Sequence, residues 1–273
     1  MKNILFYGGA SLLSYMWVNE LKRRYKIYLG LNKRWVKGSD TYSFRISDNS
    51  KVLKEILKSR KIDTIINCSG LTSVEECEKN KIMACELNTL LPSQIAKVSN
   101  QLNISFVHIS TDHLFDGFRP MLDENTQCAP INNYGYSKWL GESAVLKAHP
   151  GALILRINFF GWGPAYRHSF SDWIMGSLRS GKPITLYSNV YFTPLYVGDT
   201  ITLAHQLIEK SATGIYNLTS SDRVSKFDFG LKVARAFGLD VDLIARAEYS
   251  PLHSVPRPLD MSLDKKQSVM DAY

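Results

Sequence analysis

The first half of the chain alternates short apolar runs with longer segments whose apolar residues recur at helical spacing. One of the runs, Thr64-Ile65-Ile66, shows no alternation of polar and apolar positions. A strand covered on both faces has this pattern, which is typical of parallel sheets. The pattern predicts strands at residues 3–7, 26–31, 64–67, 105–110 and 152–157, with helices at about 11–24, 50–60, 81–100 and 133–148.

Strands that alternate with helices indicate βαβ units. We therefore expect an α/β fold, a Rossmann-type doubly wound parallel sheet. After residue 158 the loops are longer and richer in aromatic residues, with helices at about 170–180, 198–210 and 226–237 and a strand at 214–218. The change predicts a dinucleotide-binding domain over 1–157, to which 190–218 returns, and a smaller, interleaved α/β substrate-binding domain from 158–189 and 219–273.

Composition narrows the partners of this 273-residue chain. Its 33 basic and 25 acidic residues give a net charge of +8, which attracts anions. No basic run exceeds three residues, so small phosphorylated ligands explain the charge better than nucleic acid does. The four cysteines form no metal-binding spacing, and we expect no metal, reduced thiols and a cytoplasmic protein.

Membrane and export signals are weak in the sequence. No apolar run approaches the roughly 18–20 residues of a membrane span. The apolar start of the chain lacks a small-x-small cleavage site, and Glu20 begins a charged segment. We interpret this start as a strand and a helix rather than a signal peptide.

A glycine turn follows the first predicted strand. The spacing G-x-x-G-x-x-G places Gly8, Ser11 and Ser14 at the three glycine positions, so two of them are serine. A turn of this kind brings backbone N–H groups and a helix N-terminus close to a diphosphate. We expect Gly8, Ser11, Leu12 and Leu13 to bind a dinucleotide; an ordinary tight turn is the alternative.

The end of the second strand bears on cofactor choice. An acidic residue there binds the ribose 2′-hydroxyl of NAD, whereas a basic residue accepts the 2′-phosphate of NADP. This chain has Asn32, Lys33 and Arg34 and no acid. The sequence favours NADPH over NADH, unless the two cations are only solvated loop charges.

Tyr134 and Lys138 form a Y-x-x-x-K pair on a predicted helix, and four-residue spacing puts them on one face. An ammonium beside a phenol lowers the phenol pKa, which suits a Tyr that protonates a carbonyl oxygen. Such a pair also arises by chance in a chain this rich in Tyr and Lys, so its context decides. Thr111 ends a predicted parallel strand upstream, where α/β sheets bind ligands, and could share the same carbonyl.

Taken together, these segments resemble the extended short-chain dehydrogenase/reductases, and within them the dTDP-4-dehydrorhamnose reductase family. The segments that carry the resemblance are the Gly8 turn, Asn67-Cys68-Ser69-Gly70, Asn88, Ser110-Thr111-Asp112-His113-Leu114-Phe115-Asp116-Gly117, Tyr134 with Lys138, and the tail from Arg257-Pro258 to Ser262-Leu263-Asp264. The resemblance covers nearly the whole chain. It implies an NADPH-dependent reductase of the 4-keto group of a nucleotide-linked 6-deoxyhexose, acting in activated-sugar synthesis for surface polysaccharide.

The resemblance also assigns roles to single residues. Thr111, Tyr134 and Lys138 match the catalytic residues, with Tyr134 as general acid and Lys138 on the nicotinamide ribose. Cys68, Ser69, Gly70 and Asn88 match positions that line the cofactor site. His113, Phe159 and Arg257 match positions that line the substrate site, and a homodimer is compatible with the family.

Two other functions stay open and one is disfavoured. Related 4,6-dehydratases carry Glu directly after Thr-Asp, where this chain has His113, so a dehydratase is disfavoured. A nucleotide-sugar epimerase uses the same Tyr and Lys. A non-catalytic NADP-binding regulatory subunit, like that of methionine adenosyltransferase, is the other alternative.

Overall fold

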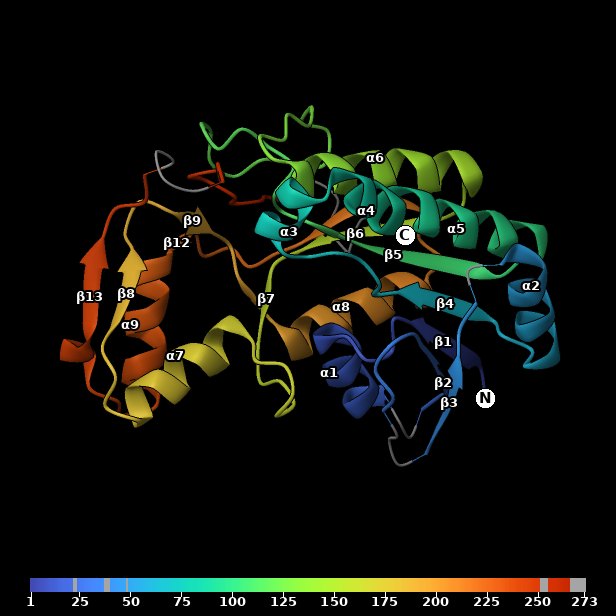
Figure 1. The fold of residues 1–273 in the computed structure, drawn as a ribbon, viewed down its shortest axis with the longest axis horizontal. Helices are drawn as coiled ribbons and strands as arrows, with labels where there is room; N and C mark the ends of the chain where they lie inside the picture. The colour runs from blue at the N-terminus through green and yellow to red at the C-terminus, as the bar shows by residue number, and fades with distance from the viewer. Residues whose placement is uncertain (22–23, 37–39, 48, 251–254, 266–273) are drawn as a thin grey trace.

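The centre of the molecule is a seven-stranded parallel sheet, seen edge-on among its helices in Figure 1. The structure is a computed structural model that describes residues 1–21, 24–36, 40–47, 49–250 and 255–265. The strands lie in the order β11-β6-β5-β4-β1-β2-β3. Their bounds are β1 (Asn3–Tyr7), β2 (Lys26–Leu31), β3 (Thr41–Arg45), β4 (Thr64–Asn67), β5 (Ser105–Thr111), β6 (Leu153–Ile157) and β11 (Gly214–Leu218).

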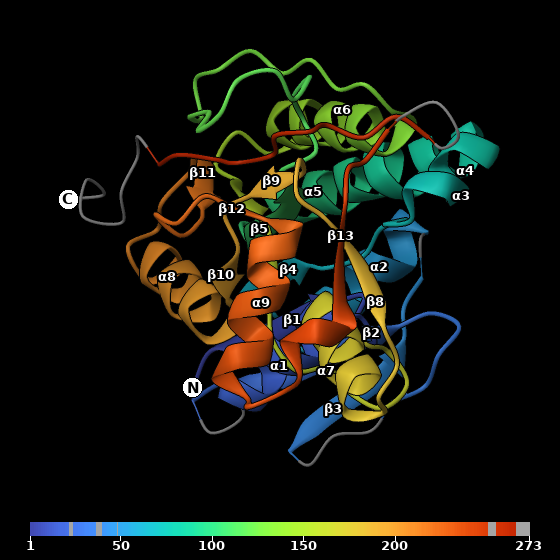
Figure 2. The ribbon, with the colours of Figure 1, turned by 90° about the vertical axis from the view of Figure 1, so that its left-hand side faces the viewer.

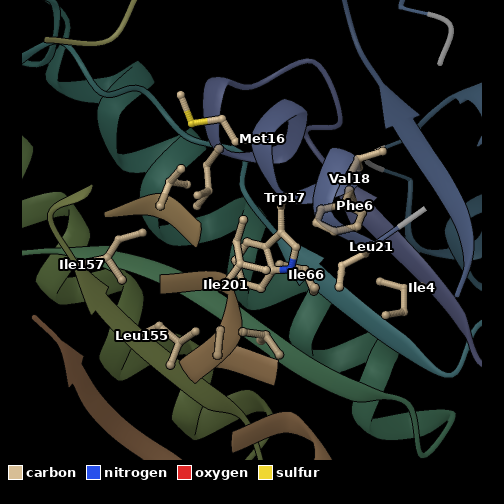
Figure 3. Close-up of a cluster of buried hydrophobic side chains, with 14 of the residues drawn as sticks. Ile4, Phe6, Met16, Trp17, Val18, Leu21, Ile66, Leu155, Ile157 and Ile201 are labelled. Carbon is tan, nitrogen blue, oxygen red and sulfur yellow. The ribbon is translucent and has the colours of Figure 1, made fainter. Parts of the chain in front are cut away.

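Helices cover both faces of the sheet, as its apolar strands predict. On one face α1 (Leu12–Leu21) and α8 (Val197–Glu209) pack together over the strands. Trp17 lies fully buried at the centre of this cluster (Figure 3) and donates from Nε1 to His205 Nε2 at 2.8 Å. The opposite face is covered by α2 (Ser50–Ser59), α5 (Leu91–Gln101) and α6 (Asn133–Ala148).

The strand order reverses between β1 and β4. From β1 the chain proceeds to β2 and β3 on one side, whereas β4, β5 and β6 extend the sheet on the other. The loops after β1 and β4 therefore diverge and leave a crevice at the carboxyl ends of the strands, where open α/β sheets bind ligands.

A smaller unit packs beside this end of the sheet, at the left of Figure 1 and toward the viewer in Figure 2. It consists of α7 (Phe170–Arg179), α9 (Lys226–Ala236) and η2 (Val241–Leu243), with β8 (Ile184–Tyr187) parallel to β13 (Ile244–Ala247). The helices share a core with these strands. Two short strand pairs connect this unit to the sheet: β7 (Phe159–Phe160) with β10 (Leu195–Tyr196), and β9 (Tyr191–Phe192) with β12 (Val224–Ser225).

The Rossmann-type fold expected from the sequence is confirmed, and the differences are local. β3 was not predicted, because this edge strand mixes polar and apolar residues and is only partly buried. The single helix expected at 81–100 is divided into α4 (Lys81–Cys85), a π-helical turn η1 (Glu86–Leu90) and α5, and is preceded by α3 (Val74–Lys79). The expected first helix ends at Leu21, and residues 22–23 lie outside the described part of the chain.

Candidate active site and dinucleotide groove

A cleft of about 340 Å³ opens at the carboxyl ends of β1, β4, β5 and β6, on the side where the smaller unit packs. A second, more open groove of about 520 Å³ continues from it past the end of β2. The two cavities share one stretch of lining, contributed by Ser11, Cys68, Ser69, Gly70 and Arg167. Together they form an elongated site that passes from the sheet edge toward the catalytic residues predicted above.

The glycine turn after β1 tolerates its two serines because of their hydrogen bonds. Gly8 has φ +83°, and a Cβ atom there would lie 2.8 Å from the backbone nitrogen of Ser69, so glycine is required. Neither serine has a positive φ. Ser14 Oγ donates to the Gly8 carbonyl at 3.1 Å, and Ser11 Oγ donates to Ser14 Oγ at 2.9 Å. The serines therefore brace the turn from inside instead of straining it.

The N-terminus of α1 faces the cleft with unused donors. The backbone N–H groups of Leu12 and Leu13 have no acceptor within the residues that the structure describes, whereas Ser14 N donates to Ser11 Oγ at 3.1 Å. Both leucines line the cleft. Free N–H groups and the positive end of the helix dipole suit the diphosphate of a dinucleotide, so the turn fits the predicted cofactor.

The open groove carries the basic residues that follow β2. Asn32, Lys33 and Arg34 line it together with Gly8, Tyr166 and others. The Arg34 guanidinium carbon lies 4.6 Å from the centre of the Tyr166 ring, and Nη1 donates to the Tyr166 carbonyl at 3.2 Å. The groove is thus lined by cations at the position where the sequence predicts the adenosine 2′-phosphate.

Thr111, Tyr134 and Lys138 meet in the cleft. Thr111 ends β5, whereas the other two lie in the first turns of α6, whose N-cap Asn132 accepts from Gly135 N at 2.9 Å. A Cβ atom at Gly135 would lie 2.1 Å from the His113 carbonyl, so glycine lets the helix approach the loop after β5. This approach places Tyr134 beside Thr111, whose Oγ1 donates to Asp112 Oδ1 at 3.2 Å.

The pKa of Tyr134 differs from the sequence-based expectation. Burial raises this pKa above its usual value, and the neighbouring Thr111 hydroxyl opposes the rise. The Lys138 ammonium, which the sequence places beside the phenol, donates from Nζ to the Ile109 carbonyl at 2.6 Å. Burial also lowers the pKa of Lys138 to about 8, against the opposing charge of Glu142. Tyr134 is accordingly a protonated phenol at neutral pH, the form that a proton donor needs.

A buried ion pair joins α6, the helix that carries Tyr134 and Lys138, to β6. Arg156 on β6 donates to Glu142 on α6, with Nη2 2.8 Å from Oε2, and both side chains are only 3% exposed. Ser110 Oγ donates to the same carboxylate at 2.5 Å. Because Glu142 follows Lys138 by one helical turn, this network fixes α6 against β5 and β6 at the level of the site.

Asn88 and Cys68 line the cleft with little capacity to bind a ligand. The Asn88 side chain accepts from Leu71 N at 2.8 Å and donates to Leu71 O at 2.9 Å and to Ser137 Oγ at 3.0 Å. It therefore joins the loop after β4 to α6. Burial raises the pKa of the Cys68 thiol to about 12, so this thiol is neutral and packs against the turn.

The predicted substrate residues occupy the far end of the cleft. The His113 ring lies edge-on to the Tyr134 ring at 5.5 Å, and burial lowers the pKa of His113, so it is neutral. Phe159 also lines the cleft, and Arg257 reaches it while pairing with Glu75. The side chain of Asn158 donates to Asp112 there.

The sequence analysis missed Tyr166 and Arg167, which line the cavities, and Lys226, which lines neither cavity but acts electrostatically on Asp112 and His113 in the cleft. Burial lowers the pKa of Lys226 to about 8, and its charge acts on Asp112. Its Nζ lies 3.3 Å from the centre of the Phe192 ring and has no hydrogen bond or ion pair within the described residues. The aromatic-rich loop from Phe159 to Tyr166 indicated in the sequence that residues near 160–167 could line the site. It did not indicate that Arg167 or Lys226 would take part.

Two absences are plain within the described chain. No group of three or more His, Cys, Asp or Glu side chains is placed to hold a metal ion there. None of the described helices combines the length and the apolar character needed to cross a membrane.

A Tyr and a Lys one helical turn apart, facing a strand-end Thr beside a dinucleotide groove, is the arrangement of the short-chain dehydrogenase/reductases, and this chain is one of the extended members of that class. Its family is more specific. The model of the RmlD substrate binding domain matches residues 1–272, and the chain belongs to that family.

The proteins that this chain resembles in sequence and in fold do not all have the same described role. It is 34% identical over 218 residues, 78% of this chain and 71% of the relative, to the probable low-salt glycan biosynthesis reductase Agl14 of Haloferax volcanii. It is 27% identical to the methionine adenosyltransferase 2 subunit beta of Xenopus laevis, over 78% of this chain and 66% of that one. The solved dTDP-4-dehydrorhamnose reductase of Bacillus anthracis in complex with NADP has the same fold, with a TM-score of 0.85, 24% identity and coverage of 97% and 92%.

Proposed function

We propose that this protein is an NADPH-dependent reductase of the 4-keto group of a nucleotide-linked 6-deoxyhexose, in activated-sugar synthesis for surface polysaccharide. The observation that carries the proposal is the meeting of Thr111, Tyr134 and Lys138 at the end of a dinucleotide groove. The relation to the reductase Agl14 supports the same reaction class.

The bound dinucleotide supplies the hydride in this reaction. The chain's own residues bind the carbonyl and handle its proton. Tyr134 is the proton donor, because burial keeps its phenol protonated. Thr111, whose hydroxyl donates to Asp112 in this structure, lines the same cleft and can direct that hydroxyl to the same carbonyl oxygen. The ammonium of Lys138, released from the Ile109 carbonyl, stabilises the phenolate that remains after proton transfer and holds the nicotinamide ribose.

The charges at the far end of the cleft favour a nucleotide-linked substrate. Arg257 lines this end, and Lys226 acts electrostatically on both Asp112 and Arg257. The half-buried Lys226 ammonium lies over the Phe170 and Phe192 rings and forms no hydrogen bond or ion pair within the described residues, so it can bind a diphosphate oxygen. The His113 ring beside Tyr134 is neutral, so it adds no charge next to the phenol where an uncharged sugar ring would lie.

The cofactor assignment to NADPH rests on Lys33 and Arg34. Both cations line the groove where the adenosine ribose would lie, and no acidic residue follows β2 at that point. A 2′-phosphate gains two cationic neighbours there, whereas a 2′-hydroxyl finds no carboxylate acceptor.

The proposal also includes the division of the chain into a dinucleotide domain, 1–157 with 190–218, and a substrate domain from the rest. A homodimer is part of it, since α4, η1 and α6 pack together and expose the large apolar side chains of Ile82, Leu90 and Tyr136. The four cysteines are unpaired, in keeping with a cytoplasmic location.

The test is oxidation of NADPH against a panel of nucleotide-linked 4-keto-6-deoxy sugars. The wild-type protein should turn over at least one of them. A protein that binds NADPH and turns over none would support the regulatory-subunit alternative. A protein that retains oxidised cofactor through purification and interconverts nucleotide sugars without net reduction would support the epimerase alternative.

A further inference from the structure

The loop between β7 and α7 reaches out of the smaller unit and contacts the dinucleotide groove. Tyr166 in this loop stacks on Arg34 and lies edge-on to Tyr15 of α1, with ring centres 6.4 Å apart. These contacts join two regions that are far apart in the sequence. The loop therefore forms one wall of the groove.

The shape of the loop is fixed by its own hydrogen bonds. Arg167 N donates to the Pro164 carbonyl at 2.9 Å, and Gly163 N donates to Asp172 Oδ2 at 2.8 Å. A Cβ atom at Gly163 would lie 2.3 Å from the Arg167 carbonyl, so the loop closes tightly on itself at this glycine. The side chain of Arg167 is consequently presented from a defined backbone position.

Arg167 lines both cavities, and its charge has no acidic partner there. Its guanidinium forms one long hydrogen bond, from Nη2 to Thr72 Oγ1 at 3.4 Å. Within the described residues no carboxylate forms an ion pair with it. An exposed guanidinium held weakly at the junction of two cavities is free to bind an anion that enters them.

The position along the site identifies that anion. The groove holds the basic residues Lys33 and Arg34 at one end, and the cleft holds Tyr134 and Lys138 at the other. A dinucleotide that places its adenosine at the first end and its nicotinamide at the second must lay its diphosphate across the shared stretch. There the N-terminus of α1 lies on one side and Arg167 on the other.

We propose that Arg167 binds the diphosphate of the dinucleotide, so that the smaller unit completes the cofactor site. The planar guanidinium can donate two parallel hydrogen bonds to phosphate oxygens. The stacking of Tyr166 on Arg34 keeps the loop in place over the groove. This inference rests on the dinucleotide binding in the proposed function but not on the identity of the sugar.

The experiment compares two ligands by isothermal titration calorimetry: NADPH, which has the diphosphate, and adenosine 2′-monophosphate, which lacks it. Arg167→Ala should weaken NADPH binding by roughly 10-fold to 100-fold, the effect of losing one or two charge-assisted hydrogen bonds. It should change the Kd of adenosine 2′-monophosphate less than about 2-fold, because that ligand ends before the diphosphate. Arg34→Ala, in contrast, should weaken both ligands.

Arg179→Ala, which removes an exposed arginine of α7 in the same unit, is the matched control and should leave both affinities unchanged. The inference is wrong if Arg167→Ala binds NADPH as the wild type does, or if both ligands lose affinity equally. Wild-type protein that binds no NADPH would overturn both this inference and the proposed function. NADPH binding that depends on Arg167, without turnover of any 4-keto sugar, would overturn the reductase proposal alone.

Discussion

Removing the charge of Glu142 should destabilise the whole protein and not only its catalytic helix. The Glu142 carboxylate accepts from Arg156 Nη2 at 2.8 Å, from Arg156 Nε at 3.0 Å and from Ser110 Oγ at 2.5 Å. Glu142→Gln keeps the size of the side chain but removes the carboxylate that pairs with the Arg156 guanidinium, which is 3% exposed. Loss of one partner of a buried pair costs about 3–5 kcal/mol. That is a large part of a typical unfolding free energy of about 5–15 kcal/mol.

Thermal unfolding followed by circular dichroism measures this loss. At about 2–4 °C per kcal/mol for a domain of this size class, Tm should fall by roughly 6–20 °C. Asp222→Asn is the matched control, because it removes the charge of an exposed pair, Lys232 with Asp222 at 3.3 Å, where the expected loss is about 0–1 kcal/mol.

The double variant Glu142→Leu/Arg156→Met separates the two causes. It leaves no buried charge unpaired, so it should recover at least half of the stability lost by Glu142→Gln. A loss below about 1 kcal/mol in the single variant, or a double variant no more stable than the single one, would refute the reasoning that an unpaired buried charge dominates.

Three further predictions concern the site. Lys138 is protonated below its pKa of about 8, and kcat/KM reports the ionisation of groups in the free protein. The value of kcat/KM should therefore fall as pH rises through about 8. A profile that is flat from pH 7 to 9 would mean that the charge of Lys138 is not needed. Lys33→Asp should shift the ratio of kcat/KM values from NADPH toward NADH by about tenfold or more, since it replaces attraction for the 2′-phosphate with repulsion, and an unchanged ratio would make Lys33 a surface charge. Lys226→Met should raise KM for the nucleotide sugar by about tenfold with little change in Tm, because the half-buried ammonium forms no hydrogen bond or ion pair within the described residues. A lower Tm with an unchanged KM would assign Lys226 to stability instead.

The strands of the central sheet could be predicted from sequence because each is a short, buried apolar run. β1, β2, β4 and β11 have the predicted bounds. The edge strand β3 lacked this signal, because an edge strand with exposed faces does not need an apolar run. The π-helical turn at Glu86–Leu90 could not be predicted either, since its residue Asn88 is hydrogen-bonded to a loop and a helix elsewhere in the chain, contacts that local spacing does not reveal.

The site residues show the same contrast between local sequence signals and tertiary packing. Thr111, Tyr134 and Lys138 could be predicted because order along the chain and helical spacing determine their meeting. Arg167 and Lys226 could not, because their positions follow from how the smaller unit packs on the sheet. The direction of the Tyr134 pKa shift was wrong for a related reason: sequence spacing places a lysine near the phenol but does not reveal the burial that raises the pKa.

The measurement that tests the central claim most directly compares the wild type with Tyr134→Phe in NADPH oxidation by nucleotide-linked 4-keto-6-deoxy sugars. The account predicts turnover by the wild type with at least one sugar, and a kcat about 10²–10⁴-fold lower for the variant, whose ring cannot donate a proton. NADPH affinity measured by calorimetry should remain within a few fold in the same variant. A Tyr134→Phe protein that turns over as fast as the wild type would contradict the account.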